Sequence, residues 1–134
     1  MRAIGIILAG GNNKRMHELS NKRAISAMPV AGTFRAIDFS LSNMSNSHIQ
    51  KVAVLTQYNS RSLNQHLSSS KWWDFGRKQG GLYVFTPTIT AEHGDWFRGT
   101  ADALYQNLVF LQSSHEPYVI IAAGDGVYKL DYNK

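Results

Sequence analysis

Short apolar segments recur along the chain and predict the strands of a buried sheet. They lie at residues 3–8, 51–56, 82–86 and 118–123. The segment 3–8 is apolar at consecutive positions, which is typical of a central parallel strand covered on both faces. The last segment ends abruptly in Gly124-Asp125-Gly126. We therefore expect several parallel strands, each stopping at a polar or glycine-rich turn.

Between these strands, apolar residues at helical spacing predict helices. One helix is expected over about 34–46 and a short one over 60–67, and a third starts at Thr100, a suitable N-cap, with Asp102 in its first turn. The stripes are Phe34, Ile37, Leu41 and Met44 in the first helix, and Ala101, Leu104, Tyr105, Leu108 and Leu111 in the third. Residues 9–33 are expected to be mostly loop.

The alternation of strands and helices defines the fold class. It predicts an α/β protein whose mostly parallel sheet has right-handed crossovers and helices on both faces. In such sheets, ligands bind at the carboxyl ends of the strands. Both Gly10-Gly11 and Asp125 follow apolar strands directly. These two places are therefore the first candidates for a functional site.

The glycine pair after the first strand is a candidate anion site. Backbone N–H groups in a glycine turn can face a phosphate, and Lys14 and Arg15 follow with positive charge. The pattern is neither a P-loop nor a dinucleotide fingerprint, because Gly-Lys-Ser/Thr and a third glycine are missing. A simple chain turn remains the alternative.

Asp125 is a candidate Mg²⁺ ligand. A carboxylate between two glycines at the end of a buried strand is sterically unobstructed, and Mg²⁺ prefers carboxylate, water and phosphate oxygens. An ordinary turn aspartate is the alternative.

Other polar and aromatic residues carry weaker signals. Arg35 and Asp38, one helical turn apart, could pair with each other, or could lie on a solvated surface. Trp96 could stack on a base or could simply plug its loop. The histidines are isolated and show no metal-binding spacing, so no role is assigned to His17, His48, His66, His93 or His115.

Composition restricts the class of protein. With 43% hydrophobic and 17% charged residues the chain is globular, and its lack of cysteine excludes disulfides and thiolate chemistry, which favours the cytoplasm. The net charge of +5 comes from scattered residues, so no nucleic-acid partner is expected. The apolar run 3–9 is far shorter than the roughly 20 residues that span a bilayer, so no membrane partner is expected.

Taken together, the motifs resemble one family across the whole chain. They are Leu-Ala-Gly-Gly-x-x-x-Arg (8–15), Asn-Lys-Arg-Ala (21–24), Phe-Arg-x-Ile-Asp-Phe-x-Leu-Ser-Asn (34–43), Val-Leu-Thr-Gln-Tyr (54–58), Gly-Thr-Ala-Asp-Ala-x-Tyr-Gln-Asn (99–107) and Gly-Asp-x-x-Tyr-Lys-x-Asp-Tyr (124–132). The chain resembles the N-terminal part of glucose-1-phosphate adenylyltransferase. The resemblance implies that residues 1–134 form the N-terminal portion of one Rossmann-like nucleotidyltransferase domain, incomplete here, without the family's left-handed β-helix.

The resemblance also implies a chemistry and a site. In this family the phosphate of glucose 1-phosphate attacks the α-phosphorus of ATP, which yields ADP-glucose for glycogen synthesis and releases pyrophosphate. By the same resemblance, Asp125 holds Mg²⁺ and Arg15 acts on the ATP phosphates. The nucleotide-binding positions that it implies are Leu8, Ala9, Gly10, Gly11, Gln57, Trp96, Gly99 and Thr100.

Departures from the family pattern gather at substrate-handling positions. Asn13 and Lys14 replace a Gly-Thr pair, Ile25 replaces a phosphate-facing lysine, Ala31 replaces a glycine and Gly126 replaces a histidine. This distribution resembles the regulatory, non-catalytic subunit of the enzyme. It implies a catalytic subunit as partner, a hetero- or homo-oligomer, ATP or ADP-glucose as possible ligands, and no activity for this chain alone.

Two alternatives stay open at this stage. The first is a competent adenylyltransferase in which Lys14 or Lys22 substitutes for the missing lysine. The second is a generic nucleotide-binding module, which only the net charge favours.

Overall fold

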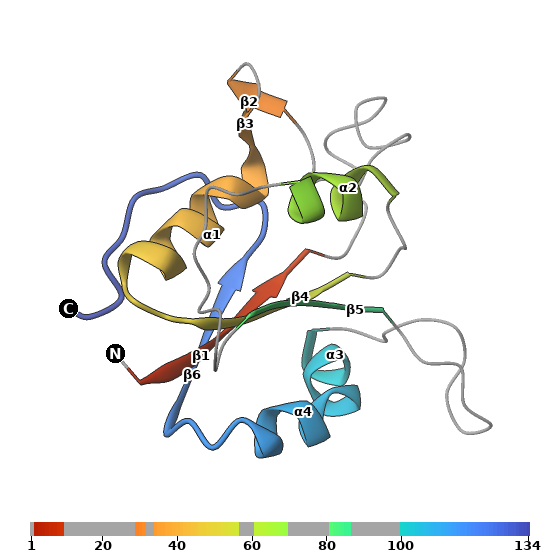
Figure 1. Ribbon diagram of the computed structural model, residues 1–134, viewed down its shortest axis with the longest axis vertical. Coiled ribbons are helices and arrows are strands. Elements are labelled where there is room, and N and C mark those ends of the chain that lie inside the picture. The colour runs from red at the N-terminus through yellow and green to blue at the C-terminus, as the bar shows by residue number, and fades with distance from the viewer. Residues whose placement is uncertain (1, 10–28, 32–33, 57–60, 70–80, 87–99) are drawn as a thin grey trace.

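A parallel sheet forms the centre of the molecule. The computed structural model describes residues 2–9, 29–31, 34–56, 61–69, 81–86 and 100–134. Within them, a 4-stranded sheet has the order β5-β4-β1-β6, with every neighbouring pair parallel (Figure 1). The strands are β1 (Ala3–Leu8), β4 (Lys51–Leu55), β5 (Gly81–Phe85) and β6 (Tyr118–Ala123). The predicted strands and the predicted α/β class are confirmed.

β1 is the central strand of this order. Ile4, Ile6 and Ile7 are at most 1% exposed, because β1 has a strand on each side and helices over both faces. The chain leaves β1 toward β4 and β5 on one side, and it returns on the other side with β6. The direction of winding therefore reverses between β1 and β6. In α/β sheets, such a reversal leaves a crevice at the carboxyl ends of the strands.

Two helices cover one face of the sheet. α1 (Ala36–Asn46) and α2 (Arg61–Ser69) lie on the same side in Figure 1. The core on this side contains Ile7, Ile37, Leu41, Met44, Val52, Val54, Leu63 and Leu67. α1 comes so close that a Cβ on Gly5 would lie 2.8 Å from the sulfur of Met44. Glycine at position 5 thus permits the contact between helix and sheet.

The other face carries α3 (Thr100–Gln106) and α4 (Leu108–Ser113) (Figure 1). The core here contains Ile6, Ala53, Leu55 and Ala103, with Phe85, Leu104, Phe110 and Leu111 packed against it. The rings of Phe85 and Phe110 meet edge to face at 4.9 Å between centroids. The ammonium of Lys51 lies 4.8 Å from the centroid of the Phe110 ring. The prediction of helices on both faces is confirmed.

The start of the first helix differs from the sequence prediction. Phe34 and Arg35 form β3 (Phe34–Arg35), which pairs antiparallel with β2 (Pro29–Ala31), and α1 begins at Ala36. Arg35 is extended, with φ −116° and ψ 159°, and its N–H donates to the Asp38 carboxylate at 2.9 Å. That bond occupies a backbone donor that a helix leaves unpaired at its start. Phe34 is 57% exposed and lies outside the buried stripe.

The predicted third helix is interrupted at Asn107. The side-chain amide of Asn107 donates to the carbonyl of Ala103 at 2.8 Å, and its backbone has ψ 18°. Such local side-chain bonds compete with regular helix. The break changes which residues face the core: Ala103 is buried, whereas Tyr105 is 66% and Leu108 40% exposed. The predicted stripe is therefore wrong at Ala101, Tyr105 and Leu108, all three exposed.

The last residues, 124–134, leave β6 and pass beside α1 (Figure 1). In the described part of the chain, every helix is too short or too polar to cross a bilayer.

Candidate functional site

The carboxyl ends of β1 and β6 lie side by side where the strand order reverses. The N–H of Gly124 donates to the carbonyl of Leu8 at 2.8 Å, and Leu8 is in register with Ala123. On the other side, the N–H of Ala9 donates to the carbonyl of Leu55 at 2.8 Å. Leu8 and Ala9, which precede the glycine pair in the chain, thus lie beside the turn that carries Asp125.

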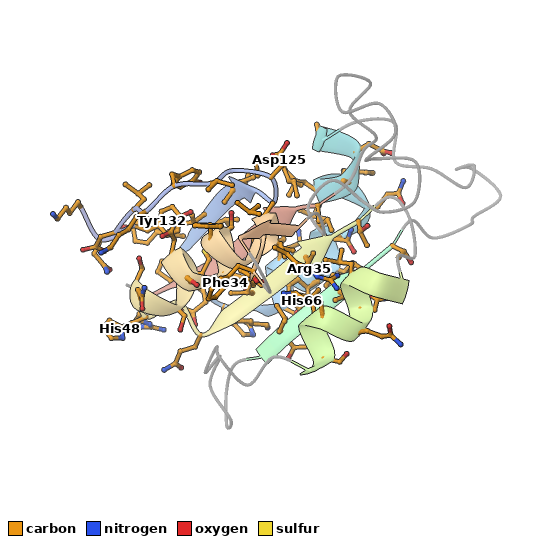
Figure 2. The ribbon with its side chains drawn as sticks, turned by 90° about the horizontal axis from the view of Figure 1, so that it is seen from above. Phe34, Arg35, His48, His66, Asp125 and Tyr132 are labelled. Carbon is orange, nitrogen blue, oxygen red and sulfur yellow. The ribbon has the colours of Figure 1, made fainter. Side chains whose placement is uncertain are left out.

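Asp125 projects from this turn and is exposed (Figure 2). Its backbone is held before the turn by the ladder to β1, and the N–H of Gly126 reaches back to the carbonyl of Ala123 at 3.5 Å. A Cβ at position 126 would lie 2.6 Å from the ring of Tyr128. The glycine at this position therefore makes room for Tyr128, and any side chain there would require that ring to move.

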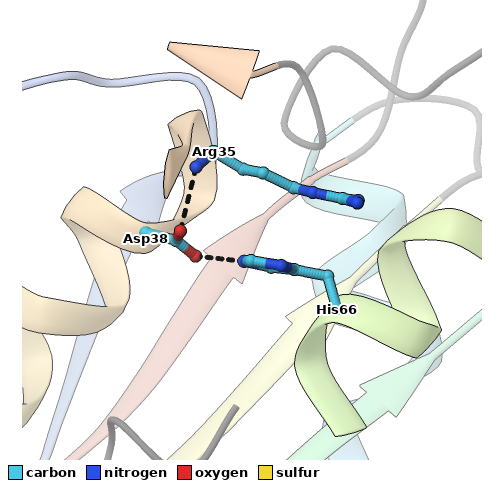
Figure 3. A network of polar contacts seen from close by, with 3 residues as sticks. All are labelled: Arg35, Asp38 and His66. Carbon is cyan, nitrogen blue, oxygen red and sulfur yellow. Dashed lines mark hydrogen bonds and ion pairs between the residues drawn. The ribbon is translucent and has the colours of Figure 1, made fainter. Parts of the chain in front are cut away.

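A buried polar network connects the two helices on one face of the sheet. The Asp38 carboxylate, with Asp38 only 7% exposed, accepts the backbone N–H of Arg35 at 2.9 Å and lies 2.6 Å from Nε2 of His66 (Figure 3). The alternative that Asp38 lies on a solvated surface is therefore wrong. His66, to which the sequence assigned no role, is its partner on α2.

Nothing in the sequence pointed to His66. It lies 28 positions from Asp38, in a segment without any motif of its own. The connections β1-α1-β4 and β4-α2-β5 place both helices on the same face of the sheet (Figure 1), which brings the two side chains together. The only available signal was that both helices were predicted to flank the same strand, which does not select a residue. The pair joins α1 to α2, the helix that follows the segment containing Gln57.

The predicted site residues fall into two groups. Leu8, Ala9 and Asp125 are described and lie at the same end of the sheet. Thr100, the predicted N-cap, is the first residue of α3. The others lie outside the described residues: Gly10, Gly11, Arg15, Gln57, Trp96 and Gly99. So do three of the departures from the family pattern, Asn13, Lys14 and Ile25.

The described residues offer Mg²⁺ a limited set of ligands. Among them there is no cluster of His, Asp or Glu side chains able to enclose a metal ion, so Asp125 is a single exposed carboxylate. Mg²⁺ is usually held by one or two carboxylates together with substrate phosphates and water. An isolated, accessible carboxylate at a strand end therefore fits a metal that arrives with a nucleotide.

Asp131, in the segment beside α1, provides a test of pH dependence. Its carboxylate accepts the backbone N–H of Asn133 at 3.0 Å and the side-chain amide of Asn133 at 2.9 Å, and these bonds lower the pKa of Asp131 below 3.8. Because the pKa of Asp131 is lowered in the folded protein, its bonds stabilise the fold at pH values above the ordinary pKa of an aspartate. This stabilisation is lost as the pH falls through the lowered pKa. In a pH titration followed by NMR, the ¹³C chemical shift of the Asp131 carboxyl should have its midpoint below pH 3.8. Asn133→Ala should move the midpoint upward, and a wild-type midpoint at or above the ordinary value contradicts the assignment.

Comparison with known proteins agrees with the fold and the motifs. The family described as "Nucleotidyl transferase" matches residues 4–134 of this chain. The strand ends that meet at Leu8 and Gly124 lie within that match. The chain belongs to the nucleotidyl transferase family.

Within this class, the chain is similar to glucose-1-phosphate adenylyltransferases. It is 43% identical to that of Clostridium novyi over 98% of this chain and 34% of the relative. It is 47% identical to that of Clostridium kluyveri over 96% of this chain and 34% of the relative. The chain thus spans about a third of the length of the curated relatives it matches. The resemblance of its motifs to the N-terminal part of these enzymes is confirmed.

A solved structure supports the architecture. A Bacillus anthracis protein assigned as a glucose-1-phosphate thymidylyltransferase, in complex with a sucrose, superposes with a TM-score of 0.70 and 19% identity. The alignment covers 96% of this chain and 46% of the other. The shared feature is the fold, which confirms the predicted Rossmann-like α/β architecture.

Proposed function

We propose that this chain is the N-terminal part of a regulatory subunit of glucose-1-phosphate adenylyltransferase, acting in glycogen synthesis. In this proposal it binds ATP or ADP-glucose with Mg²⁺ and associates with a catalytic subunit. The observation that carries the nucleotide site is the 2.8 Å bond between Gly124 N–H and Leu8 carbonyl. It sets exposed Asp125 beside the strand that leads into Gly10 and Gly11.

Each of these residues would have a distinct task. Backbone N–H groups at the glycine pair would face the phosphates, and Arg15 would neutralise part of their charge. The Asp125 carboxylate would hold Mg²⁺, and a bound Mg²⁺ stabilises the charge that develops on transferring phosphoryl groups. Leu8 and Ala9 would act through their backbone, since Ala9 is only 1% exposed.

The regulatory part of the proposal rests on the altered residues. Ile25 stands where the family pattern has a phosphate-facing lysine, and Asn13 and Lys14 change the loop after the glycine pair. Loss of one charge-stabilising contact costs on the order of 10²-fold in rate. A site that keeps its metal carboxylate but loses such a contact suits nucleotide binding better than turnover. A hetero-oligomer with the catalytic subunit would transmit that binding.

A catalytically competent adenylyltransferase is the second candidate. Relatives named glucose-1-phosphate adenylyltransferase are 43% and 47% identical to this chain, and Asp125 is present and exposed. In that case Lys14 or Lys22 would contact the phosphates. A generic nucleotide-binding module has only the +5 net charge in its favour.

A mixed assay tests the proposal. ADP-glucose synthesis is measured for the complete protein alone, for the catalytic subunit of the same organism alone, and for the two together. We expect only residual synthesis by the protein alone, and a changed rate or KM in the mixture. In calorimetry, Asp125→Asn should remove most of the Mg²⁺ dependence of ATP binding, whereas Glu116→Gln, which changes a carboxylate before the start of β6, should not. Robust synthesis by the protein alone would establish the catalytic alternative.

A further inference from the structure

We infer that Ser40 and Asn43 of α1, together with Ser47 at its C-cap, form a positioning row that holds the Asp125 turn by binding the chain on both sides of it. The inference rests on the proposed function in one respect, the role of Asp125 as a metal ligand. The hold on the turn itself follows from contacts between described residues. These contacts join positions more than 80 residues apart.

Ser40 and Asn43 lie on one face of α1, and Ser47, the C-cap residue, continues the row. Their spacing places them one above the other, beside the stripe of Ile37, Leu41 and Met44 that faces the sheet. They are buried, with Ser40 and Ser47 at 0% and Asn43 at 4% exposure. Buried polar side chains in proteins are almost always hydrogen-bonded, because an unpaired one is costly. The partners of this row are all in β6 or in the segment 124–134.

Before the turn, Ser40 holds the end of β6. Its hydroxyl donates to the carbonyl of Ala123 at 2.7 Å. Ala123 is the last residue of β6, and the next residue, Gly124, donates to Leu8 of β1 at 2.8 Å. The strand end is therefore fixed from the helix and from the sheet at once.

After the turn, Asn43 holds the departing chain. Its amide nitrogen donates to the carbonyl of Tyr128 at 3.0 Å, and its amide oxygen accepts the N–H of Leu130 at 3.1 Å. The asparagine thus pairs with the backbone as a neighbouring strand would. Since the described residues 124–134 form no strand or helix, these bonds satisfy backbone groups that regular structure does not.

Ser47 extends the row to the end of the segment. Its hydroxyl oxygen accepts the N–H of Tyr132 at 2.9 Å, and its carbonyl accepts the side-chain amide of Asn133 at 3.3 Å. Asp125 therefore sits between two anchored stretches while its own side chain stays exposed. A turn with glycine on both sides of the carboxylate would otherwise be free to reorient. Groups that fix a metal ligand in this way commonly alter metal affinity when they are removed.

The test compares three single variants of α1. Ser40→Ala removes the bond before the turn, Asn43→Ala removes both bonds after it, and Asn46→Ala is the control, an exposed asparagine on the same helix. Amide hydrogen exchange of residues 124–126 is measured without nucleotide or metal, with the amides of β1 as internal reference. The MgCl₂ concentration for half-maximal ATP binding is measured on the same proteins.

Ser40→Ala and Asn43→Ala should speed exchange in the turn by about fivefold or more, as for loss of a hydrogen bond of ordinary strength, with β1 unchanged. They should also raise the half-maximal MgCl₂ concentration by about tenfold or more, the effect of removing an outer partner of a metal ligand. Asn46→Ala should change neither quantity. If Asn43→Ala does not fold, Ser40→Ala, which removes a single bond, decides the question.

Unchanged exchange in the turn overturns the inference. Faster exchange with an unchanged MgCl₂ requirement, while Asp125→Asn raises that requirement, leaves the row a purely structural support and overturns its positioning role. If Asp125→Asn itself has no effect on the MgCl₂ requirement, the proposed metal site is what fails. The exchange data then still decide whether the row holds the turn.

Discussion

Replacing Asp38 with alanine is expected to destabilise the protein by about 3 kcal/mol, because hydrogen bonds to a charged group contribute about 1.5–3 kcal/mol each. Asp38 is 7% exposed, and its carboxylate contacts both the Arg35 N–H and the His66 imidazole. The alanine variant removes the acceptor of the Arg35 N–H and the partner of His66 Nε2 in a place that water reaches poorly. Urea unfolding followed by circular dichroism measures the change in the free energy of unfolding.

A double-mutant cycle identifies the partner. His66→Ala removes one bond of Asp38, so the double variant should be more stable than the sum of the single losses predicts, by about 1–2 kcal/mol. Asp38→Asn keeps the shape and an acceptor oxygen for Arg35 N–H, and it should cost less than alanine. Strictly additive losses would show that the 2.6 Å contact does not couple α1 and α2 in solution.

Restoring lysine at position 25 is expected to raise ADP-glucose synthesis by the complete protein by about 10²-fold. In the proposed function, Ile25 stands at the position of a phosphate-facing lysine of the family that the motifs resemble. A cation there would stabilise negative charge that develops during transfer, which an apolar side chain does not. Steady-state kcat/KM, measured with saturating MgCl₂, reports the change.

Ile25→Met is the matched control, because it alters the same position without adding charge. It should leave the rate at the level of the unmodified protein. If Ile25→Lys has no effect, the missing lysine is not what limits turnover. The regulatory proposal would then depend on Asn13 and Lys14.

The strands were predictable because each is a short apolar run with a clear stop. β1 and β6 begin and end where the sequence pattern places them, and β4 and β5 differ by a residue at their ends. Consecutive apolar positions in the first strand also predicted its place between two neighbours. A strand that is buried on both faces needs apolar side chains at every position. The pattern therefore predicts that this strand lies in the middle of the sheet.

Helix ends were less predictable than strands. Phe34 continues the apolar spacing of α1, yet it lies in β3 and is 57% exposed. The Asp38 carboxylate binds Arg35 N–H and starts the helix after it. Similarly, Asn107 interrupts the third helix through its bond to the carbonyl of Ala103. In both cases a single side chain competes with the periodic pattern for a backbone group.

The candidate site, too, was predictable from the sequence only in part. Asp125 was recognisable from its two flanking glycines and from the apolar strand before it. The row of Ser40, Asn43 and Ser47 was not, because polar residues on a helix predict a solvated face unless a partner is known. Their partners follow β6, more than 80 positions later.

By itself, the sequence determined the α/β class, the strands, the motifs of the nucleotidyl transferase family and the candidate carboxylate Asp125. These features depend on short-range patterns of apolar residues and turn residues, which are visible within a single short stretch of the sequence. Only the tertiary structure decided that Leu8 meets Gly124, that Asp38 binds His66 and that Asn43 holds the segment after Asp125. Each of these contacts joins residues far apart in the chain, and their geometry exists only after the parallel crossovers have brought β1, α1, α2 and β6 together.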